Sequence, residues 1–90
     1  KVRRRLLAAR EGTLLACDAC GFSRPNLQQS LQESLFEAHH LIPLAEAAAR
    51  RTRLSDMALL CACCHRLIHR LAIERRQWVQ PQELRKVLGV

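Results

Sequence analysis

The stretch CACCHRLIHR, residues 61–70, decides how the rest of this 90-residue sequence is interpreted. Cys61 and Cys64 form a CxxC pair, and His65 and His69 follow at a spacing of four residues. On a helix, this spacing places both imidazoles on one face, where they can bind the same metal ion. The stretch therefore predicts a helix that starts at two thiols and carries two histidines on its surface.

A second CxxC pair, Cys17 and Cys20, is separated from the first by forty residues. Two such pairs suit tetrahedral zinc, because each pair brings two thiolates to one edge of the coordination sphere. A redox dithiol is the alternative, but the sequence lacks the expected βαβ pattern and the second pair would be unexplained. We therefore expect a structural zinc site of Cys17, Cys20, Cys61 and Cys64. Cys61, Cys63 and Cys64 could in principle exchange roles, but we expect Cys63 to be a free, packed thiol.

The remaining histidines, His39 and His40, are adjacent and are followed by Pro43. If their strand packs across the helix face of His65 and His69, one of them can complete a site of three protein ligands. The other is then free to accept a proton. Because adjacent strand residues point to opposite faces, we expect the strand to bend or end here. A second structural zinc site, or an accidental clustering of histidines, is the alternative.

The secondary structure around these motifs follows from hydrophobic spacing and from turn residues. The expected elements are a helix over 2–11, a polar connection over 22–34, a strand within 34–44, a loop over 45–55, an antiparallel partner strand over 56–61, a helix over 65–78 and a helix over 81–89. We expect one domain over residues 1–90.

Size and cysteine usage favour a protein stabilised by metal. A chain this short buries only about 60–65% of the surface that its unfolded form exposes, so a metal crosslink would add needed stability. The sequence has no apolar run long enough for a transmembrane helix and nothing that resembles a signal peptide. An odd number of cysteines argues against a closed disulfide framework, so we expect a reducing, cytoplasmic environment and no membrane.

The charge of the chain favours a polyanionic partner. Thirteen arginines and two lysines give a formal charge of +7 and a pI near 10.1. Arginine binds phosphate bidentately, and the three aromatic residues are too few for a single-strand stacking platform, so contact with a duplex backbone is favoured. The alternative is a basic domain that binds nothing, or the solvated part of a larger protein.

Taken together, the motifs CDACGF, EAHHLIPL and SDMALLCACCHRLIHR resemble those of the HNH endonucleases, most closely the bacterial restriction-type members. The resemblance covers approximately residues 14–71, and the tail RQWVQPQELRKVL is similar to the end of such domains. It implies an α+β fold, namely a small ββα-metal domain with a four-cysteine zinc knuckle and flanking N- and C-terminal helices.

The resemblance also implies roles for individual residues. His39, His65 and His69 would hold a catalytic metal, and His40 would be the general base. Asp56 stands where the family usually has the asparagine that braces the loop of the base. An ionised aspartate accepts hydrogen bonds but cannot donate them, so we expect this brace to be altered. Glu37 either hydrogen-bonds a ligand imidazole or pairs with an arginine at the surface.

The activity implied is metal-dependent hydrolysis of phosphodiester bonds in double-stranded DNA by a protein of the bacterial cytoplasm. The catalytic ion would be zinc, nickel, manganese or magnesium, with magnesium mildly disfavoured because it prefers oxygen ligands. The arginines expected to contact phosphates are Arg50, Arg51, Arg53, Arg66 and Arg70. An additional targeting domain in a longer parent chain would supply specificity. The alternatives are a non-catalytic zinc-stabilised DNA-binding module and a nuclease toxin domain with the same core.

Overall fold

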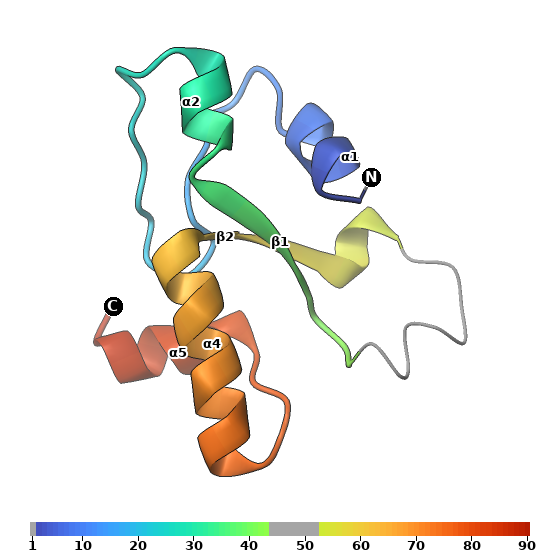
Figure 1. Ribbon diagram of the computed structural model, residues 1–90, viewed down its shortest axis with the longest axis vertical. Coiled ribbons are helices and arrows are strands. Elements are labelled where there is room, and N and C mark those ends of the chain that lie inside the picture. Colours follow the sequence, from blue (N-terminus) through green and yellow to red (C-terminus); the bar gives the residue numbers. More distant parts are fainter. Residues whose placement is uncertain (1, 44–52) are drawn as a thin grey trace.

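The fold is built on two strands and the helix that continues from them, in agreement with the α+β prediction. The computed structural model describes residues 2–43 and 53–90. Strands β1 (Phe36–His40) and β2 (Met57–Cys61) form an antiparallel sheet, and α4 (Ala62–Arg75) begins directly after β2. In Figure 1, α4 runs from the end of β2 down the molecule at an angle to the two strands. This ββα arrangement brings the residues of β1 beside the first turns of α4.

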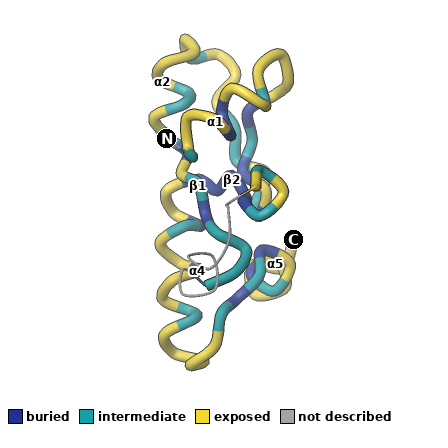
Figure 2. The backbone as a smooth tube through the Cα atoms, turned by 90° about the vertical axis from the view of Figure 1, so that its right-hand side faces the viewer, coloured by how far each residue is buried: buried dark blue, intermediate teal, exposed yellow. Residues whose placement is uncertain are grey.

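The register of the sheet is regular from one end to the other. Phe36 pairs with Cys61, His39 with Ala58 and His40 with Met57. One further bond, from Leu41 N to the carbonyl of Asp56 at 2.8 Å, continues the pairing past the end of β1. All five residues of β2 are buried, and Figure 2 shows the buried positions gathered along the sheet while α4 exposes its outer side. The apolar DMALLC segment therefore contains the antiparallel partner strand that its sequence predicted.

Helix α4 starts earlier and ends earlier than its predicted range of 65–78. Cys61 is the N-cap, and its sulfur accepts a hydrogen bond from Cys64 N at 3.4 Å. The helix therefore begins inside the CxxC pair, because the first turn is held by a thiol rather than by Ser or Asp. At the other end, Arg76 has a left-handed conformation (φ 57°) that stops the helix and turns the chain back toward the sheet.

The two flanking helices are present. Helix α1 (Val2–Ala9) packs against β1, and the Arg3 guanidinium donates to the carbonyl of Phe36 at 2.9 Å. Helix α5 (Pro81–Leu88) begins at a proline and is capped by the Glu83 carboxylate, which accepts from Gln80 N at 3.1 Å. Proline at the first helical position and an acidic residue in the first turn both favour this start.

Two shorter helical elements complete the described residues. Helix α2 (Gln29–Glu33) lies in the segment predicted as a polar connection, where no helix was expected from the apolar spacing. The segment has no apolar stripe, but a side-chain bond from Gln29 to Glu33 at 3.0 Å supports a single turn. The 3-10 helix η1 (Leu54–Asp56) leads into β2. No helix within the described ranges is long and apolar enough to cross a membrane.

Candidate metal centres

Four of the five cysteines meet where the chain after α1 approaches the start of α4. The sulfurs of Cys17, Cys20, Cys61 and Cys64 all lie within 4.8 Å of one another, and Cys20 and Cys61 are 3.8 Å apart. All five cysteines belong to the described residues and are free thiols. The structure thus brings together the four cysteines predicted as zinc ligands, in a group that could hold one tetrahedral ion.

Backbone N–H groups surround these sulfurs. Cys17 Sγ accepts from Ala19 N at 3.4 Å and from Cys20 N at 3.5 Å, and Cys20 Sγ accepts from Phe22 N at 3.4 Å. Burial raises the pKa of the Cys61 and Cys64 thiols. Burial also opposes ionisation of Cys17, but the N–H donors outweigh it and lower the pKa of that thiol. Donors aimed at sulfur favour the thiolate form that binds metal.

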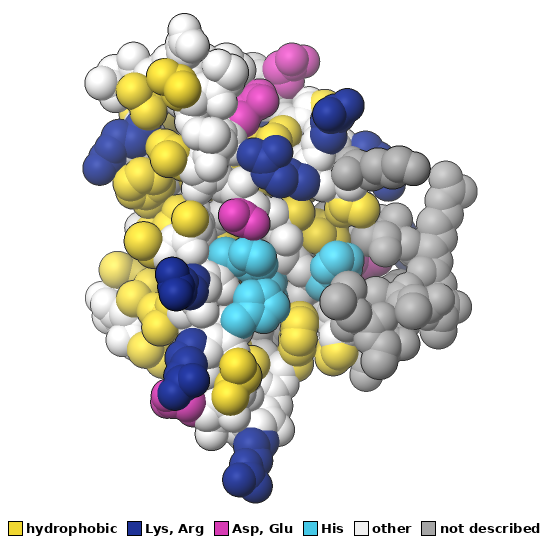
Figure 3. Space-filling model, in the orientation of Figure 1, with side chains coloured by type: hydrophobic (Ala, Val, Ile, Leu, Met, Phe, Trp, Pro, Cys, Tyr) yellow, Lys and Arg dark blue, Asp and Glu magenta, His cyan; other side chains and the backbone are white. Residues whose placement is uncertain are grey.

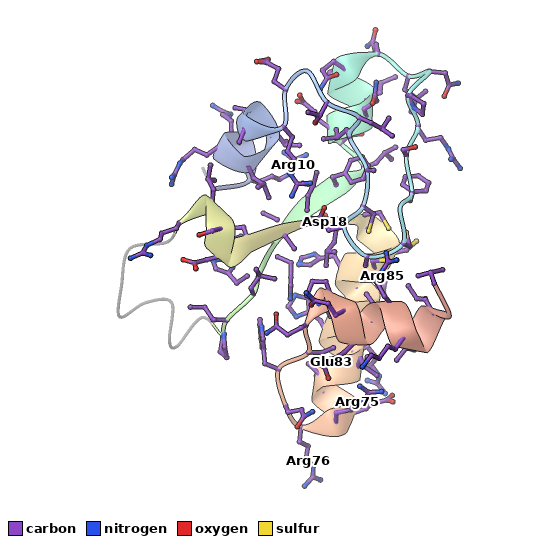
Figure 4. All side chains as sticks on the ribbon, turned by 180° about the vertical axis from the view of Figure 1, so that it is seen from behind. Arg10, Asp18, Arg75, Arg76, Glu83 and Arg85 are labelled. Carbon is purple, nitrogen blue, oxygen red and sulfur yellow. The ribbon has the colours of Figure 1, made fainter. Side chains whose placement is uncertain are left out.

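The loop between Cys17 and Cys20 is fixed by contacts with three residues that the sequence pattern did not reveal. Asp18 forms a two-pronged ion pair with Arg10, with both N–O distances at 2.9 Å, and Figure 4 shows the two side chains pointing toward each other. The same carboxylate accepts from Leu59 N at 2.8 Å, while Asp18 N donates to the Leu59 carbonyl at 2.8 Å. On the α5 side, Arg85 donates to the Ala19 carbonyl at 2.6 Å.

Cys63 is exposed, so the expectation of a packed thiol was wrong. Because α4 already begins at Ala62, Cys63 occupies its first turn and faces solvent, while Cys64 faces inward. It takes no part in the group of four sulfurs.

Three histidines form the second centre. His39 of β1 and His65 and His69 of α4 each offer a ring nitrogen, and these nitrogens lie within 4.8 Å of one another. The Nε2 atoms of His65 and His69 are 3.1 Å apart, as expected for an i, i+4 pair aimed at one point. Figure 3 shows the histidine side chains gathered on the face that carries α4 and the end of β1.

His39 is the buried member of this centre. Only 3% of its surface is exposed, and within the described part of the chain its Nε2 atom has no hydrogen-bond partner. Burial, together with the neighbouring rings of His69, His65 and His40, lowers the pKa of His39 to about 4. At neutral pH the ring is therefore neutral, with a lone pair available. A buried imidazole nitrogen that lacks a partner fits a metal ligand, because such atoms are otherwise paired.

Glu37 supports one of these histidines. Its carboxylate lies 3.6 Å from His65 Nδ1, on the ring edge opposite the nitrogen that faces His69. Glu37 and His39 are two residues apart on β1 and therefore share the face that meets α4. Burial and His69 lower the pKa of His65, and Glu37 opposes this. Of the two predicted alternatives for Glu37, the structure favours contact with an imidazole.

His40 is held apart from this centre by the regular alternation of β1. It is partly buried and belongs to neither group of potential metal-binding side chains found in residues 2–43 and 53–90. Its carbonyl accepts a hydrogen bond from the indole N–H of Trp78 at 3.2 Å. Asp56, the other residue predicted for the catalytic set, lies at the end of η1, where its carboxylate accepts from Arg53 N at 3.0 Å.

The predicted DNA-contacting arginines are only partly described. Arg66 and Arg70 are exposed on α4, each one residue beyond a histidine of the centre, and Arg70 also pairs with Glu74 at 3.0 Å. Arg53 is exposed just before η1. Arg50 and Arg51 lie outside the described residues.

The strand pair, the following helix and the two clusters define the class of this protein as a ββα-metal domain. The sequence model of the HNH endonuclease family matches residues 17–71, and the chain belongs to this family. No curated protein and no solved structure matches the sequence of this chain. The predicted family is thus confirmed, while the restriction-type subgroup stays a prediction.

Proposed function

We propose that the chain is a metal-dependent endonuclease that hydrolyses phosphodiester bonds in DNA. The observation that carries this proposal is the different placement of two neighbouring histidines. His39 converges with His65 and His69 on one point, whereas His40 lies outside that group. A purely structural metal site gives no reason for a free imidazole beside a ligand imidazole.

The three-histidine centre is the proposed site of one catalytic divalent cation, which when bound would stabilise negative charge on the scissile phosphate and on the leaving 3′ oxygen. His39 would anchor the ion from β1, and His65 and His69 would complete the ligand set from α4. The nitrogen donors favour zinc, nickel or manganese over magnesium. Glu37 would hold the His65 ring in place and raise its basicity.

His40 is the proposed general base. An imidazole whose usual pKa lies near working pH can take a proton from the attacking water, provided that it is not itself a ligand. The peptide that follows it is held by the bond from Leu41 N to the carbonyl of Asp56 in η1 and by the bond from Trp78 to the His40 carbonyl, so the ring projects from a fixed backbone. The arginines that follow the ligand histidines, Arg66 and Arg70, would neutralise nearby phosphates of the duplex.

The four-cysteine group is the proposed structural zinc site. It joins the segment after α1 to the start of α4, and α4 supplies two of the three histidines. Recognition of a restriction target, through a further domain in a longer parent chain, belongs to the same proposal.

A plasmid-cleavage assay with a panel of divalent ions, with and without chelator, tests this function in the parent and in His40→Ala. We expect cleavage that requires a divalent ion and falls by about 10²- to 10⁴-fold in the variant. The variant should keep its zinc and its fold, measured by metal analysis and circular dichroism. Gln77→Ala, at an exposed residue that belongs to neither group of metal-binding side chains, is the matched control.

Two outcomes would contradict the proposal. Equal cleavage by His40→Ala would exclude His40 as the base. If the protein binds DNA but cleaves it with none of the divalent ions, the result would instead identify a non-catalytic zinc-stabilised DNA-binding module.

A further inference from the structure

We propose that Trp78 is a positioning residue that holds the two histidines of β1 in their different roles, its ring orienting His39 and its indole N–H fixing the backbone at His40. This inference rests on the proposed function. Trp78 lies outside residues 17–71, which the family match covers.

The indole ring forms one wall of the histidine centre. It stacks on the His39 ring with a centroid distance of 5.5 Å and an interplanar angle of 7°. It also meets the His69 ring edge-on at 6.0 Å and 80°. A parallel, offset ring at this distance restricts rotation of the imidazole about χ2, which is otherwise a broad torsion. Trp78 therefore fixes the direction in which the buried Nε2 atom of His39 points.

The N–H of the same indole acts on the next residue. Trp78 Nε1 donates to the carbonyl of His40 at 3.2 Å, and Gln80 Nε2 donates to the carbonyl of Leu41 at 2.6 Å. On the other side, Leu41 N donates to the Asp56 carbonyl at 2.8 Å. The peptide between His40 and Leu41 is thus held from two directions at the point where β1 ends. The His40 ring therefore projects from a backbone that these hydrogen bonds hold in place.

The segment that carries Trp78 is itself anchored at both ends. Arg76 stops α4 in a left-handed conformation, and Pro81 starts α5 only five residues later. Between them, Val79 is almost fully buried, with 1% of its surface exposed. The indole is consequently presented to β1 by a short connection with little freedom.

The first measurement uses the unaltered, zinc-loaded protein. Trp78 is the single tryptophan of the chain, so its indole proton gives one resolved NMR signal. We expect this proton to exchange with solvent more slowly than that of a free indole, because it is hydrogen-bonded. Exchange at the rate of free indole would overturn the hydrogen-bond part of the proposal.

Two substitutions separate the ring from the N–H group. Trp78→Phe keeps an aromatic face but removes the donor, and Trp78→Leu removes both. Titration with Ni²⁺ alone, followed by calorimetry, measures the histidine centre without DNA. We expect nickel affinity within about threefold of the parent for Trp78→Phe and weakened by about tenfold or more for Trp78→Leu, the range usual for groups that orient metal ligands.

Cleavage kinetics supply the second readout. Trp78→Phe should lower kcat by about tenfold or more at unchanged KM, because a misplaced base affects the reaction but not DNA binding. Gln77→Ala, one residue away, should match the parent in every measurement. Parent-like nickel affinity in a folded Trp78→Leu, or a parent-like kcat in Trp78→Phe, would overturn the proposal.

DNA cleavage by the protein and the positioning role of Trp78 are tested by different measurements. If the parent cleaves no DNA, the proposed function is wrong, and the nickel affinities still decide whether Trp78 orients His39. Should Trp78→Leu not fold, the kcat of Trp78→Phe and the indole exchange rate decide the proposal.

Discussion

At the scale of single residues, His39 and His40 differ in environment although one peptide bond joins them. The strand pleat sends consecutive side chains to opposite faces, so His39 meets α4 and is buried while His40 remains partly accessible. No bend within β1 is needed, because the regular strand ends at His40 itself. The separation of proposed ligand from proposed base therefore costs the backbone no strain.

The carboxylate of Asp56 accepts hydrogen bonds, whereas the side-chain amide of the family's usual asparagine can also donate them. Its carboxylate receives the N–H of Arg53, a contact that an amide oxygen can make equally well. We therefore expect Asp56→Asn to cleave DNA within about threefold of the parent and Asp56→Ala to lose about tenfold or more, because alanine removes the bond from Arg53 N together with every other contact of the carboxylate. Plasmid-cleavage rates for both variants check this. Equal rates for Asp56→Ala and the parent would remove Asp56 from the catalytic set.

Asp18 is expected to matter more for stability than its partial exposure indicates. Asp18→Ala leaves the N–H of Leu59 without its acceptor, which costs about 1–3 kcal/mol of unfolding free energy. Arg10→Ala removes only the ion pair at the surface and should cost about 0–1 kcal/mol. Denaturant unfolding of the zinc-loaded variants measures both values. If Asp18→Ala and Arg10→Ala lower the free energy of unfolding by the same amount, the hydrogen bond from Leu59 N to Asp18 contributes nothing to stability.

The candidate ligands could be predicted from sequence because cysteine and histidine reveal them by type and spacing. The contacts of Asp18 with Leu59, of Arg85 with Ala19 and of Trp78 with β1 could not, because the partners are backbone groups or a ring far away along the chain. A single charged residue inside a CxxC pair carries no signal of a bond to a strand forty residues later. The exposure of Cys63 was missed for a related reason, since it depends on the turn at which α4 begins.

At the scale of elements, α4 depends on the group of four thiols at its start. Its boundaries could be predicted only to within three residues, because the spacing of Leu and Ile marks its apolar face but not its caps. The N-cap is a cysteine sulfur, and a helix of fourteen residues is marginal without tertiary support. The proposed zinc would thus stabilise the element that carries His65 and His69.

Removal of zinc should therefore unfold more than the cysteine loops. We expect a chelator, or Cys61→Ser, to lower the helical circular dichroism signal and to abolish nickel binding at the histidines, because the energy of metal binding is part of the folding energy. Cys63→Ser is the matched control and should behave as the parent does. A Cys61→Ser variant that keeps both its helix content and a full equivalent of zinc would contradict the structural site.

At the scale of the whole molecule, the charge of +7 is the property most directly related to a DNA partner. Arginines outnumber lysines, and two of those expected at phosphates lie on α4 beside the histidines. Arg50 and Arg51 belong to the same prediction but lie outside the described residues. The sequence indicates a polyanion through its composition alone, whereas the approach of a duplex depends on how the elements are arranged.

DNA affinity should fall steeply with salt, and part of the slope should come from α4. The slope of log K against log salt is about −0.9 for each phosphate neutralised. Replacing Arg66 and Arg70 by alanine should therefore make the slope less steep by about 1.8. Arg76→Gln is the control, because Figure 4 shows that side chain pointing away from the body of the molecule at the end of α4. An affinity that did not change with salt would argue against phosphate contacts altogether.

The two centres meet within a single turn of helix, since Cys64 and His65 are consecutive residues. Ion binding at one centre orders backbone that the other also needs, so the two binding equilibria are linked. By thermodynamic reciprocity, the factor by which the first ion raises the affinity for the second equals the factor by which the second ion raises the affinity for the first. We therefore expect the two proposed ions to be loaded cooperatively, so that a domain that loses the ion of its four thiols would also lose the ion of its three histidines.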